Sequence, residues 1–420
     1  MAHEKFHYKS LDEVQQKAAE LGVSLPFAND TKVLAQPLTV RNITFPNRLG
    51  IAPMEGADST PEGAPTEYTT RRYVNEAIGG SSVIWFEAIS IVEEGRSSKT
   101  QLLLTRDTLD EFKKMTAAVK EAGMTANGYA PYLIMQANHS GRYSNPGNKP
   151  APMIAYRHPI LEQYRAADDS CIVTDDYLKG LEEKFGEAAK LAKEAGFDAI
   201  DIKSCHGYLL AELASAYNRP GEYGGSFENR FRLLKNGIRA AKVYEDDSFM
   251  VTARIGIYDG YAYPWGFGVS RESGMTPDLT EPIRLVRDLH NELGLNMVNL
   301  TMGNPYATTH VTRPFDFGKY EPDEHPFVGL SRMIHGLGAV KKAVPEMTVW
   351  ASAPSYLRAN ADLFSAGAVE QSLCDGMLFG RRAFADPDFA NEIVKTGRID
   401  PKRVCLTCGK CGDLIRAHKP

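Results

Sequence analysis

Three side chains that can carry or donate protons, and a thiol, lie within six residues of one another in the segment KSCHGY at positions 203–208. A short apolar run rich in β-branched residues, AIDI at 199–202, precedes them and predicts a buried strand. Barrels of parallel strands place catalysis at the carboxyl ends of those strands, so this grouping favours an active site. The alternative is a structural loop in which His206 and Tyr208 cap neighbouring backbone groups.

The composition limits the classes of protein to which the chain can belong. Its 420 residues, 43% apolar and 24% charged, are typical of a globular protein. A net charge of −5 without a basic cluster argues against nucleic-acid binding. No apolar run reaches the roughly 18–20 residues of a membrane span, and the first ten residues lack the apolar part of a signal peptide. We therefore expect a cytoplasmic protein without membrane contact.

Apolar strands alternate with amphipathic helices along most of the chain. The predicted strands lie at 48–54, 81–90, 129–139, 199–202, 249–256, 297–303, 348–353 and 375–381. Eight strand–helix pairs predict parallel pairing and a closed (β/α)8 TIM barrel, whereas an open doubly wound sheet lacks support because no G-x-G-x-x-G follows a strand. We expect an N-terminal extension at 1–33 with a helix at 11–21, the barrel at 34–398, and a cysteine-containing tail at 399–420. The helix after the second strand is predicted to run over 108–122 and to end at Gly123.

The predicted strand ends bring polar and small residues to one rim of the barrel. These residues are Pro53, Met54, Glu55, Ala88, Gln136, Lys203, His206, Tyr208, Arg254, Ser352, Ala353, Gly380 and Arg381. Gln136 offers an amide and Arg254 a fixed cation, while the small Ala88 lets a planar ring approach the backbone. Gly380 and Arg381 follow the eighth strand, where barrels often hold a phosphate. Such a rim suits a flat heteroaromatic ligand with a phosphate tail.

Five segments resemble, in order, the signature sequences of the old yellow enzyme, or NADH:flavin oxidoreductase, superfamily of FMN-dependent barrels. They are NRLGIAPM, MQANHSGR, HGYLLAELASAYNRPGEYGGSFENRFR, ARIGIYDGYAYPWGFG and LFGRRAFADPDF. The resemblance extends over about 34–396, and the layout is most similar to the FMN barrel of 2,4-dienoyl-CoA reductase and enoate reductase-type proteins. It implies an enzyme that moves hydride from NAD(P)H through FMN to the C=C bond of an α,β-unsaturated carbonyl or enoate compound.

The resemblance also assigns tasks to the rim residues. Gln136 and Arg254 would contact the pyrimidine side of the flavin. Pro53, Met54 and Ala88 would line its ring, and Gly380 and Arg381 would hold its phosphate with help from the backbone at Ser352 and Ala353. His206 would bind the substrate carbonyl and Tyr208 would deliver the proton. Donors near the carbonyl oxygen stabilise an enolate-like transition state, which is the chemistry that this reaction needs.

Two rim residues depart from the family pattern. Lys203 stands where relatives commonly carry a histidine, and a cation there would polarise an oxygen strongly, which favours an electron-rich or carboxylate-bearing acceptor. The alternative is a lysine neutralised by Glu55 or Asp201. Glu55 stands where a threonine or cysteine often tunes the flavin. Its carboxylate would either lower the reduction potential of the flavin or turn away into a salt bridge on the rim.

The tail CLTCGKCGDLIRAHKP places Cys405, Cys408 and Cys411 close together. Two-domain relatives such as 2,4-dienoyl-CoA reductase and trimethylamine dehydrogenase carry a 4Fe–4S cluster after the barrel. The spacing here is one residue shorter between the second and third cysteines than in that motif, and a fourth cysteine is absent from the tail. Four thiolates normally complete such a cluster, so zinc and a metal-free tail remain alternatives.

Two other activities fit parts of the pattern. An amine dehydrogenase would use the same barrel in the oxidative direction, although Lys203 would repel an ammonium substrate. A lyase would form a Schiff base on Lys203, but it leaves Gln136, Arg254 and Arg381 unexplained. The expected partners are a small unsaturated carbonyl compound, NAD(P)H or an electron-donating flavoprotein, and further copies of the chain in a homo-oligomer. The aromatic insertion 258–268 is expected to wall the substrate pocket.

Overall fold

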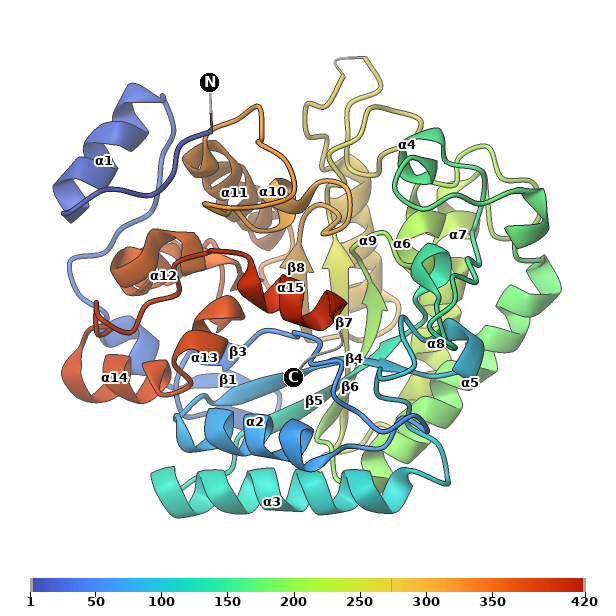
Figure 1. Ribbon diagram of the computed structural model, residues 1–420, viewed down its shortest axis with the longest axis horizontal. Coiled ribbons are helices and arrows are strands. Elements are labelled where there is room, and N and C mark those ends of the chain that lie inside the picture. Colours follow the sequence, from blue (N-terminus) through green and yellow to red (C-terminus); the bar gives the residue numbers. More distant parts are fainter. Residues whose placement is uncertain (1–2, 273, 418–420) are drawn as a thin grey trace.

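The computed structural model describes residues 3–272 and 274–417. Eight parallel strands form a closed barrel in the order β3-β4-β5-β6-β7-β8-β9-β10 (Figure 1). They are β3 (Leu49–Ile51), β4 (Val83–Ser90), β5 (Tyr132–Asn138), β6 (Ala199–Ser204), β7 (Met250–Gly256), β8 (Met297–Thr301), β9 (Thr348–Ser352) and β10 (Gly376–Phe379). Each falls within or across a predicted strand, so the (β/α)8 barrel is confirmed.

Helices surround the barrel, and the neighbours α2 and α3, and α5 and α8, pack side by side (Figure 1). The longer ones are α1 (Leu11–Glu20), α2 (Glu67–Ile78), α3 (Leu109–Asn127), α5 (Asp175–Glu194), α8 (Arg232–Lys242), α9 (Thr280–Asn291), α11 (Pro326–Ala343), α12 (Ala361–Glu370) and α14 (Phe389–Thr396). The short ones are α4 (Pro159–Glu162), α6 (Leu209–Ala214), α7 (Phe227–Arg230), α10 (Thr309–Thr312), α13 (Arg381–Ala385) and α15 (Lys410–Arg416). The 3₁₀ turns are η1 (Lys32–Ala35), η2 (Glu93–Gly95), η3 (Gly141–Tyr143), η4 (Asp169–Cys171) and η5 (Pro354–Asn360). Within the described ranges, no helix is long and apolar enough to cross a bilayer.

Helix α3 corrects the prediction that Gly123 ends the second helix. The helix continues to Asn127 and ends at Gly128, whose φ of 77° is the left-handed conformation typical of a helix C-terminus. Gly123 lies inside α3, where a Cβ atom would come within 2.5 Å of the Pro131 ring. The glycine therefore permits close packing of α3 on the chain before β5, and the sequence pattern could not separate that use from helix termination.

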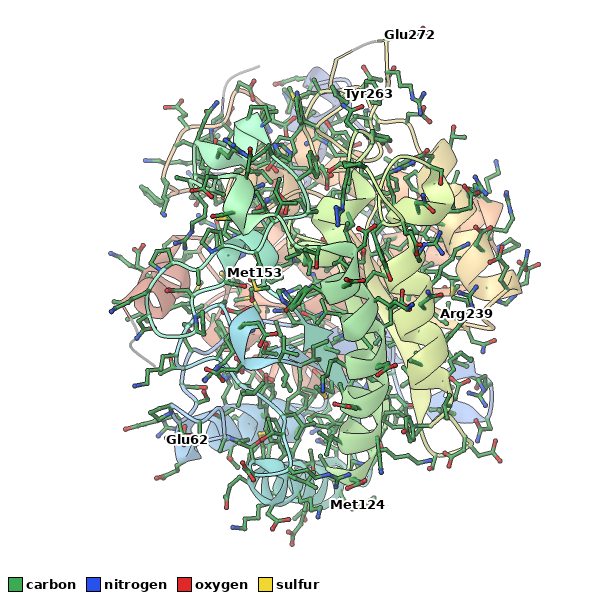
Figure 2. The ribbon with its side chains drawn as sticks, turned by 90° about the vertical axis from the view of Figure 1, so that its right-hand side faces the viewer. Glu62, Met124, Met153, Arg239, Tyr263 and Glu272 are labelled. Carbon is green, nitrogen blue, oxygen red and sulfur yellow. The ribbon has the colours of Figure 1, made fainter. Side chains whose placement is uncertain are left out.

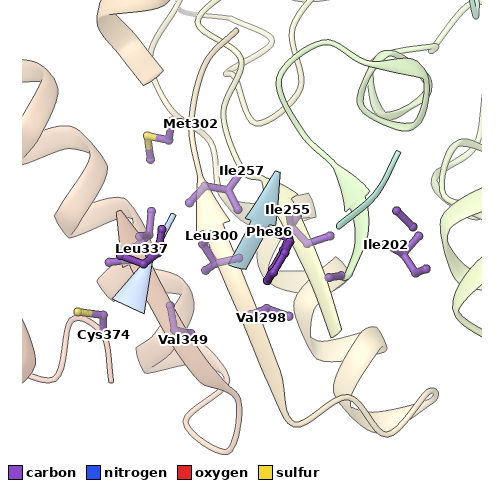
Figure 3. Packing of buried hydrophobic residues seen from close by; sticks show 14 of the residues in the cluster. Phe86, Ile202, Ile255, Ile257, Val298, Leu300, Met302, Leu337, Val349 and Cys374 are labelled. Carbon is purple, nitrogen blue, oxygen red and sulfur yellow. The ribbon is translucent and has the colours of Figure 1, made fainter. Parts of the chain in front are cut away.

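Side chains alternate along each barrel strand between the interior and the surrounding helices. Outward residues such as Phe86, Val298 and Leu300 form the core between barrel and helices (Figure 3). Inward residues, among them Trp85 and Trp350, pack with an unpredicted hairpin of β1 (Leu38–Val40) and β2 (Ile43–Phe45). This hairpin covers the amino-terminal end of the barrel, so the opposite rim is the end available for ligands.

A buried ion pair ties the loop after β5 to α6, the helix that follows Tyr208. Arg142 Nε donates to Glu212 Oε1 over 2.8 Å, and the backbone N–H of Ala155 donates to Glu212 Oε2 over 3.0 Å. Both charged side chains are buried. Burial raises the pKa of Glu212 while Arg142 opposes the rise. The pair therefore holds two neighbouring loops of the rim in place.

We predict that Glu212→Gln lowers the free energy of unfolding by about 3–5 kcal/mol, because it leaves the guanidinium of Arg142 buried without its counter-charge. The matched control is Glu228→Gln, which removes an exposed partner of Arg284 and should cost about 0–1 kcal/mol. Urea denaturation measures both. Equal losses in the two variants would show that the buried ion pair contributes no more to the free energy of unfolding than the exposed one.

Candidate active site

A buried carboxylate organises the floor of the predicted site. Asp201, on β6, accepts hydrogen bonds from Trp85 Nε1 at 2.7 Å and Gln136 Nε2 at 2.6 Å, and from the backbone N–H of Arg254. Burial raises its pKa, and these donors oppose the rise. Gln136 thus gives one of its two amide N–H donors to Asp201, which leaves its carbonyl oxygen and its second N–H for a ligand.

Ala88 reaches the same side of the sheet as Gln136 because β4 contains an irregularity. The register between β4 and β5 shifts between Trp85 and Ala88, after which Ala88 pairs with Gln136. Without this bulge, strict alternation from the inward Trp85 would turn Ala88 outward. Glu87 points outward instead and accepts hydrogen bonds from Arg72 and Tyr73. The small side chain of Ala88 accordingly faces the rim, in the place predicted for it.

Two cations on adjacent strands are buried at the rim. Lys203 and Arg254 are paired in register across β6 and β7, and 6% and 5% of their surfaces are exposed. Burial lowers the pKa of each, although each also feels Asp201. Arg254 Nε has no hydrogen-bond partner among the residues that the structure describes. Lys203 Nζ lies 4.0 Å from the centre of the Tyr208 ring and, within the same residues, forms no ion pair with Glu55 or Asp201. Direct neutralisation by an ion pair is therefore not observed.

His206 and Gly207 follow β6 in left-handed conformations, with φ of 67° and 70°. This backbone is strained for the histidine and natural for the glycine. Nε2 of His206 lies 3.4 Å from Thr301 Oγ1. Burial, reinforced by Arg254 and Lys203, holds the pKa of His206 well below its usual range. The imidazole is therefore neutral at pH 7 and carries one N–H for donation.

Tyr208 sits among hydroxyl and carboxylate groups. Its Oη donates to Glu55 Oε1 over 3.3 Å and lies 2.8 Å from Tyr306 Oη, while Ser97 Oγ donates to Glu55 Oε2 over 3.2 Å. Burial, Glu55 and Tyr306 all raise the pKa of Tyr208, so it stays protonated. Glu55 thus contacts hydroxyls and, among the described residues, forms no salt bridge on the rim. Sequence reasoning missed Tyr306; its position shortly after the strand at 297–303 was the available signal.

The predicted phosphate residues meet where the first and last strands of the barrel adjoin. A larger residue at position 380 would clash, because a Cβ atom on Gly380 would lie 2.8 Å from Met54 Sδ. Arg381 Nη1 donates to the Pro314 carbonyl over 2.8 Å, and its buried Nη2 has no partner in the described part of the chain. Burial lowers the pKa of Arg381 to about 10. Pro53, Ser352 and Ala353 are half-buried at the same rim, and Ala353 has a φ of 74°.

A cavity of about 650 Å³ joins this rim to the cysteine tail, and Glu55, Arg381, Cys405, Cys408 and Cys411 are among its lining residues. Cys405 Sγ accepts the backbone N–H of Thr407 over 3.4 Å, and burial raises the pKa of its thiol. No set of three or more His, Cys, Asp or Glu side chains is arranged to hold a metal ion within residues 3–272 and 274–417. The three thiols as placed do not fit a cluster, and metal binding by the tail stays a prediction.

The aromatic insertion packs largely into the fold. Tyr261 and Phe267 are buried, with Tyr261 against His158 and Phe267 against Phe231. Figure 2 places Tyr263 at the same end of the molecule as Glu272, and at the opposite end from Met124 on α3. None of the aromatic residues of the insertion lines the 650 Å³ cavity. That they wall a substrate pocket stays a prediction.

Two buried histidines near the rim are structural. His139 Nε2 lies 2.8 Å from Tyr177 Oη, and His158 Nε2 lies 2.9 Å from the Trp265 carbonyl oxygen. Burial lowers the pKa of each to about 4. Both rings are therefore neutral in the folded protein at pH values where an unfolded chain, with histidine pKa values near 6.5, takes up protons.

This difference predicts acid sensitivity. Because the unfolded chain binds more protons at these two histidines below about pH 6.5, their contribution to stability is complete above that pH and falls by ~1.4 kcal/mol per pH unit for each histidine as pH drops. Buried carboxyls with raised pKa values, such as Asp201 and Glu212, act in the opposite sense, so a variant is needed to isolate the histidines. Urea denaturation of the wild type and of His139→Gln at about pH 7 and about pH 5 should show less acid sensitivity in the variant. An equal pH dependence of the unfolding free energy in the two proteins would contradict the prediction.

The fold and the rim together define an α/β-barrel protein with buried, unpartnered donors at the carboxyl ends of its strands. The family model described as the NADH:flavin oxidoreductase / NADH oxidase family matches residues 33–266 of the 420, and the chain belongs to this family. The superfamily predicted from the motifs is thereby confirmed.

Individual relatives agree with this assignment. The NADPH dehydrogenase of Bacillus velezensis is 34% identical over 223 residues, which are 52% of this chain and 62% of that protein. Among solved structures, a 2-naphthoyl-CoA reductase bound to 2-naphthoyl-CoA shares the fold with a TM-score of 0.75 at 18% identity, over 93% of this chain and 56% of the other. A histamine dehydrogenase from Rhizobium sp. 4-9 does so with a TM-score of 0.68 at 20% identity, over 93% and 52%.

Proposed function

We propose that this protein is an FMN-dependent ene-reductase that uses NAD(P)H to reduce the C=C bond of an α,β-unsaturated carbonyl or enoate compound. The observation that supports this most is the grouping at one rim of a buried proton donor, Tyr208, with a neutral His206 and the buried cation of Lys203. Proton donor and oxygen-binding groups at one rim are what conjugate reduction needs. The catalytic unit is the barrel, residues 34–398.

Residues of the rim fit a flavin mononucleotide. The buried Nε of Arg254 and Nη2 of Arg381 have no protein partner within the described residues, and both suit an electron-rich ring edge or a phosphate. Gln136 presents its carbonyl oxygen, and Ala88, which pairs with Gln136 in register, leaves space for a ring. When bound, FMN would take hydride from NAD(P)H and give it to the β-carbon of the acceptor.

The chain's own residues would handle the acceptor's oxygen and proton. Negative charge grows on the carbonyl oxygen as hydride arrives, so the N–H of His206 and the ammonium of Lys203 stabilise the transition state more than the ground state. Tyr208, kept protonated, gives its proton to the α-carbon. Burial of these groups strengthens each electrostatic contact because little water competes.

Lys203 also helps to choose between the ene-reductase and the two other activities, an amine dehydrogenase and a lyase. An amine dehydrogenase would bring an ammonium or amine to the flavin, next to a buried cation that has no ion-pair partner within the described residues, and repulsion disfavours it. A lyase that forms a Schiff base on Lys203 gives no use to the unpartnered donors of Arg254 and Arg381. Either NAD(P)H or an electron-donating flavoprotein fits as reductant, and no step here passes through a metal cluster. We propose a homo-oligomer for the assembled enzyme.

Tyr208→Phe tests the proposed function. The variant should keep its rate of flavin reduction by NAD(P)H, because that step needs no proton from Tyr208, and should lose ~10²-fold or more in the rate of flavin reoxidation by the alkene. Anaerobic stopped-flow absorbance follows the two half-reactions separately. Tyr129→Phe is the control, since it removes a hydroxyl, just before β5, that donates to the Gly80 carbonyl, just before β4, away from the rim. If both half-reactions slow equally in Tyr208→Phe, Tyr208 does not donate the proton.

A further inference from the structure

Tyr208 and Tyr306 form a pair of hydroxyls that leads from the buried site to solvent. Their Oη atoms are 2.8 Å apart, although the residues are 98 positions apart in the sequence. Tyr208 is 4% exposed, whereas Tyr306 is 40% exposed. The hydrogen-bonded pair therefore links a buried residue to one that borders solvent.

Tyr208 Oη has two hydrogen-bond neighbours. It donates to Glu55 Oε1 over 3.3 Å, and it lies 2.8 Å from Tyr306 Oη, where either hydroxyl can be the donor. Burial raises the pKa of both tyrosines, and both are protonated at neutral pH. Once Tyr208 has given up its proton, its oxygen can only accept, so Tyr306 is then the donor between the two.

A rigid support holds Tyr306 in this position. Its ring stacks on Tyr143, with centroids 3.7 Å apart and planes 16° apart. Asn304 joins the two, because its Oδ1 accepts the backbone N–H of Tyr306 at 2.9 Å and its Nδ2 donates to Tyr143 Oη at 3.2 Å. Asn304 can take this position only because Gly207 lacks a side chain, since a Cβ atom there would lie 2.1 Å from Asn304 Nδ2. The turn after β6 and the loop after β8 therefore pack closely against each other.

We propose that Tyr306 relays protons from solvent to Tyr208 and so restores the proton donor after each turnover. The proposal rests on the proposed ene-reductase function. Tyr306 acts through Tyr208 and does not itself reach the acceptor.

In the relay, every bond to hydrogen that forms is matched by one that breaks. As a C–H bond forms at the α-carbon of the acceptor, the O–H bond of Tyr208 breaks. The O–H bond of Tyr306 then breaks as that of Tyr208 re-forms, and water or a buffer acid reprotonates Tyr306 and leaves as its conjugate base. The hydride for the β-carbon originates from NAD(P)H, so each turnover adds one hydride and one proton to the C=C bond and yields one NAD(P)⁺.

Tyr306→Phe is the direct test, because it keeps the ring and removes only the outer hydroxyl. In this variant the first turnover, which uses the proton already on Tyr208, should proceed at the wild-type rate, and steady-state turnover should fall by ~10²-fold. Imidazolium buffer should restore part of the steady-state rate in a concentration-dependent way. The matched control is Tyr129→Phe, which removes a hydroxyl that donates to the Gly80 carbonyl away from the rim, and its steady-state rate should stay close to wild type.

Two kinetic outcomes would overturn the relay. If Tyr306→Phe turns over like Tyr129→Phe, solvent protons reach Tyr208 by another path. If its first turnover slows as much as its steady state, Tyr306 orients the site or is itself the donor. Tyr208→Phe distinguishes failure of the proposed function from failure of the relay. If alkene reduction is slow in Tyr208→Phe but turnover is normal in Tyr306→Phe, only the relay is contradicted.

A measurement without turnover tests the hydrogen bond itself. With ¹³Cζ-labelled tyrosine, the signal of Tyr208 is assigned by its disappearance in Tyr208→Phe. This signal should shift in Tyr306→Phe and stay in place in Tyr129→Phe. An unchanged Tyr208 signal in Tyr306→Phe would overturn the relay, whether or not the protein reduces alkenes.

Discussion

Buried positive charge at the mouth of the barrel is the constraint on which the rest of the site depends. Lys203, Arg254 and Arg381 are all less than a tenth exposed, and burial lowers the pKa of each. Taking such charges out of water costs several kcal/mol per ion unless partners compensate. Within the described residues, the two arginines keep buried nitrogens without hydrogen-bond partners. A site of this kind gains stability when an anionic, electron-rich ligand arrives, which is how the site would bind a flavin phosphate.

The fold sets up this charge distribution through the alternation of its strands. Asp201, Lys203 and Arg254 all lie on the inward parity of β6 and β7, and Asp201 is the one that is fully satisfied, by three donors. Its carboxylate accepts a hydrogen bond from Gln136 below the rim and another from the backbone N–H of Arg254. The side chains of Lys203 and Arg254 are left directed to the mouth, where the chemistry would occur.

Much of this could be predicted from the sequence, because it depends on local patterns. Eight apolar runs separated by amphipathic helices define the barrel, and the residues at the ends of those runs define the rim. The missed features depend on contacts between distant segments. The bulge that turns Ala88 inward, the packing use of Gly123 and the approach of Tyr306 to Tyr208 leave no periodic signal. For Lys203, sequence offered two environments, and only the structure shows its ammonium over an aromatic ring.

The most direct test of the account is whether the buried arginine after β10 recognises a phosphate. Binding of FMN and of riboflavin to flavin-free protein, followed by flavin fluorescence, isolates that group because the two ligands differ only by the phosphate. The account predicts that the wild-type protein binds FMN ~10²-fold or more tightly than riboflavin, and that Arg381→Met removes most of this difference. Equal affinity of the wild-type protein for the two ligands, or an undiminished preference for FMN in Arg381→Met, would contradict it.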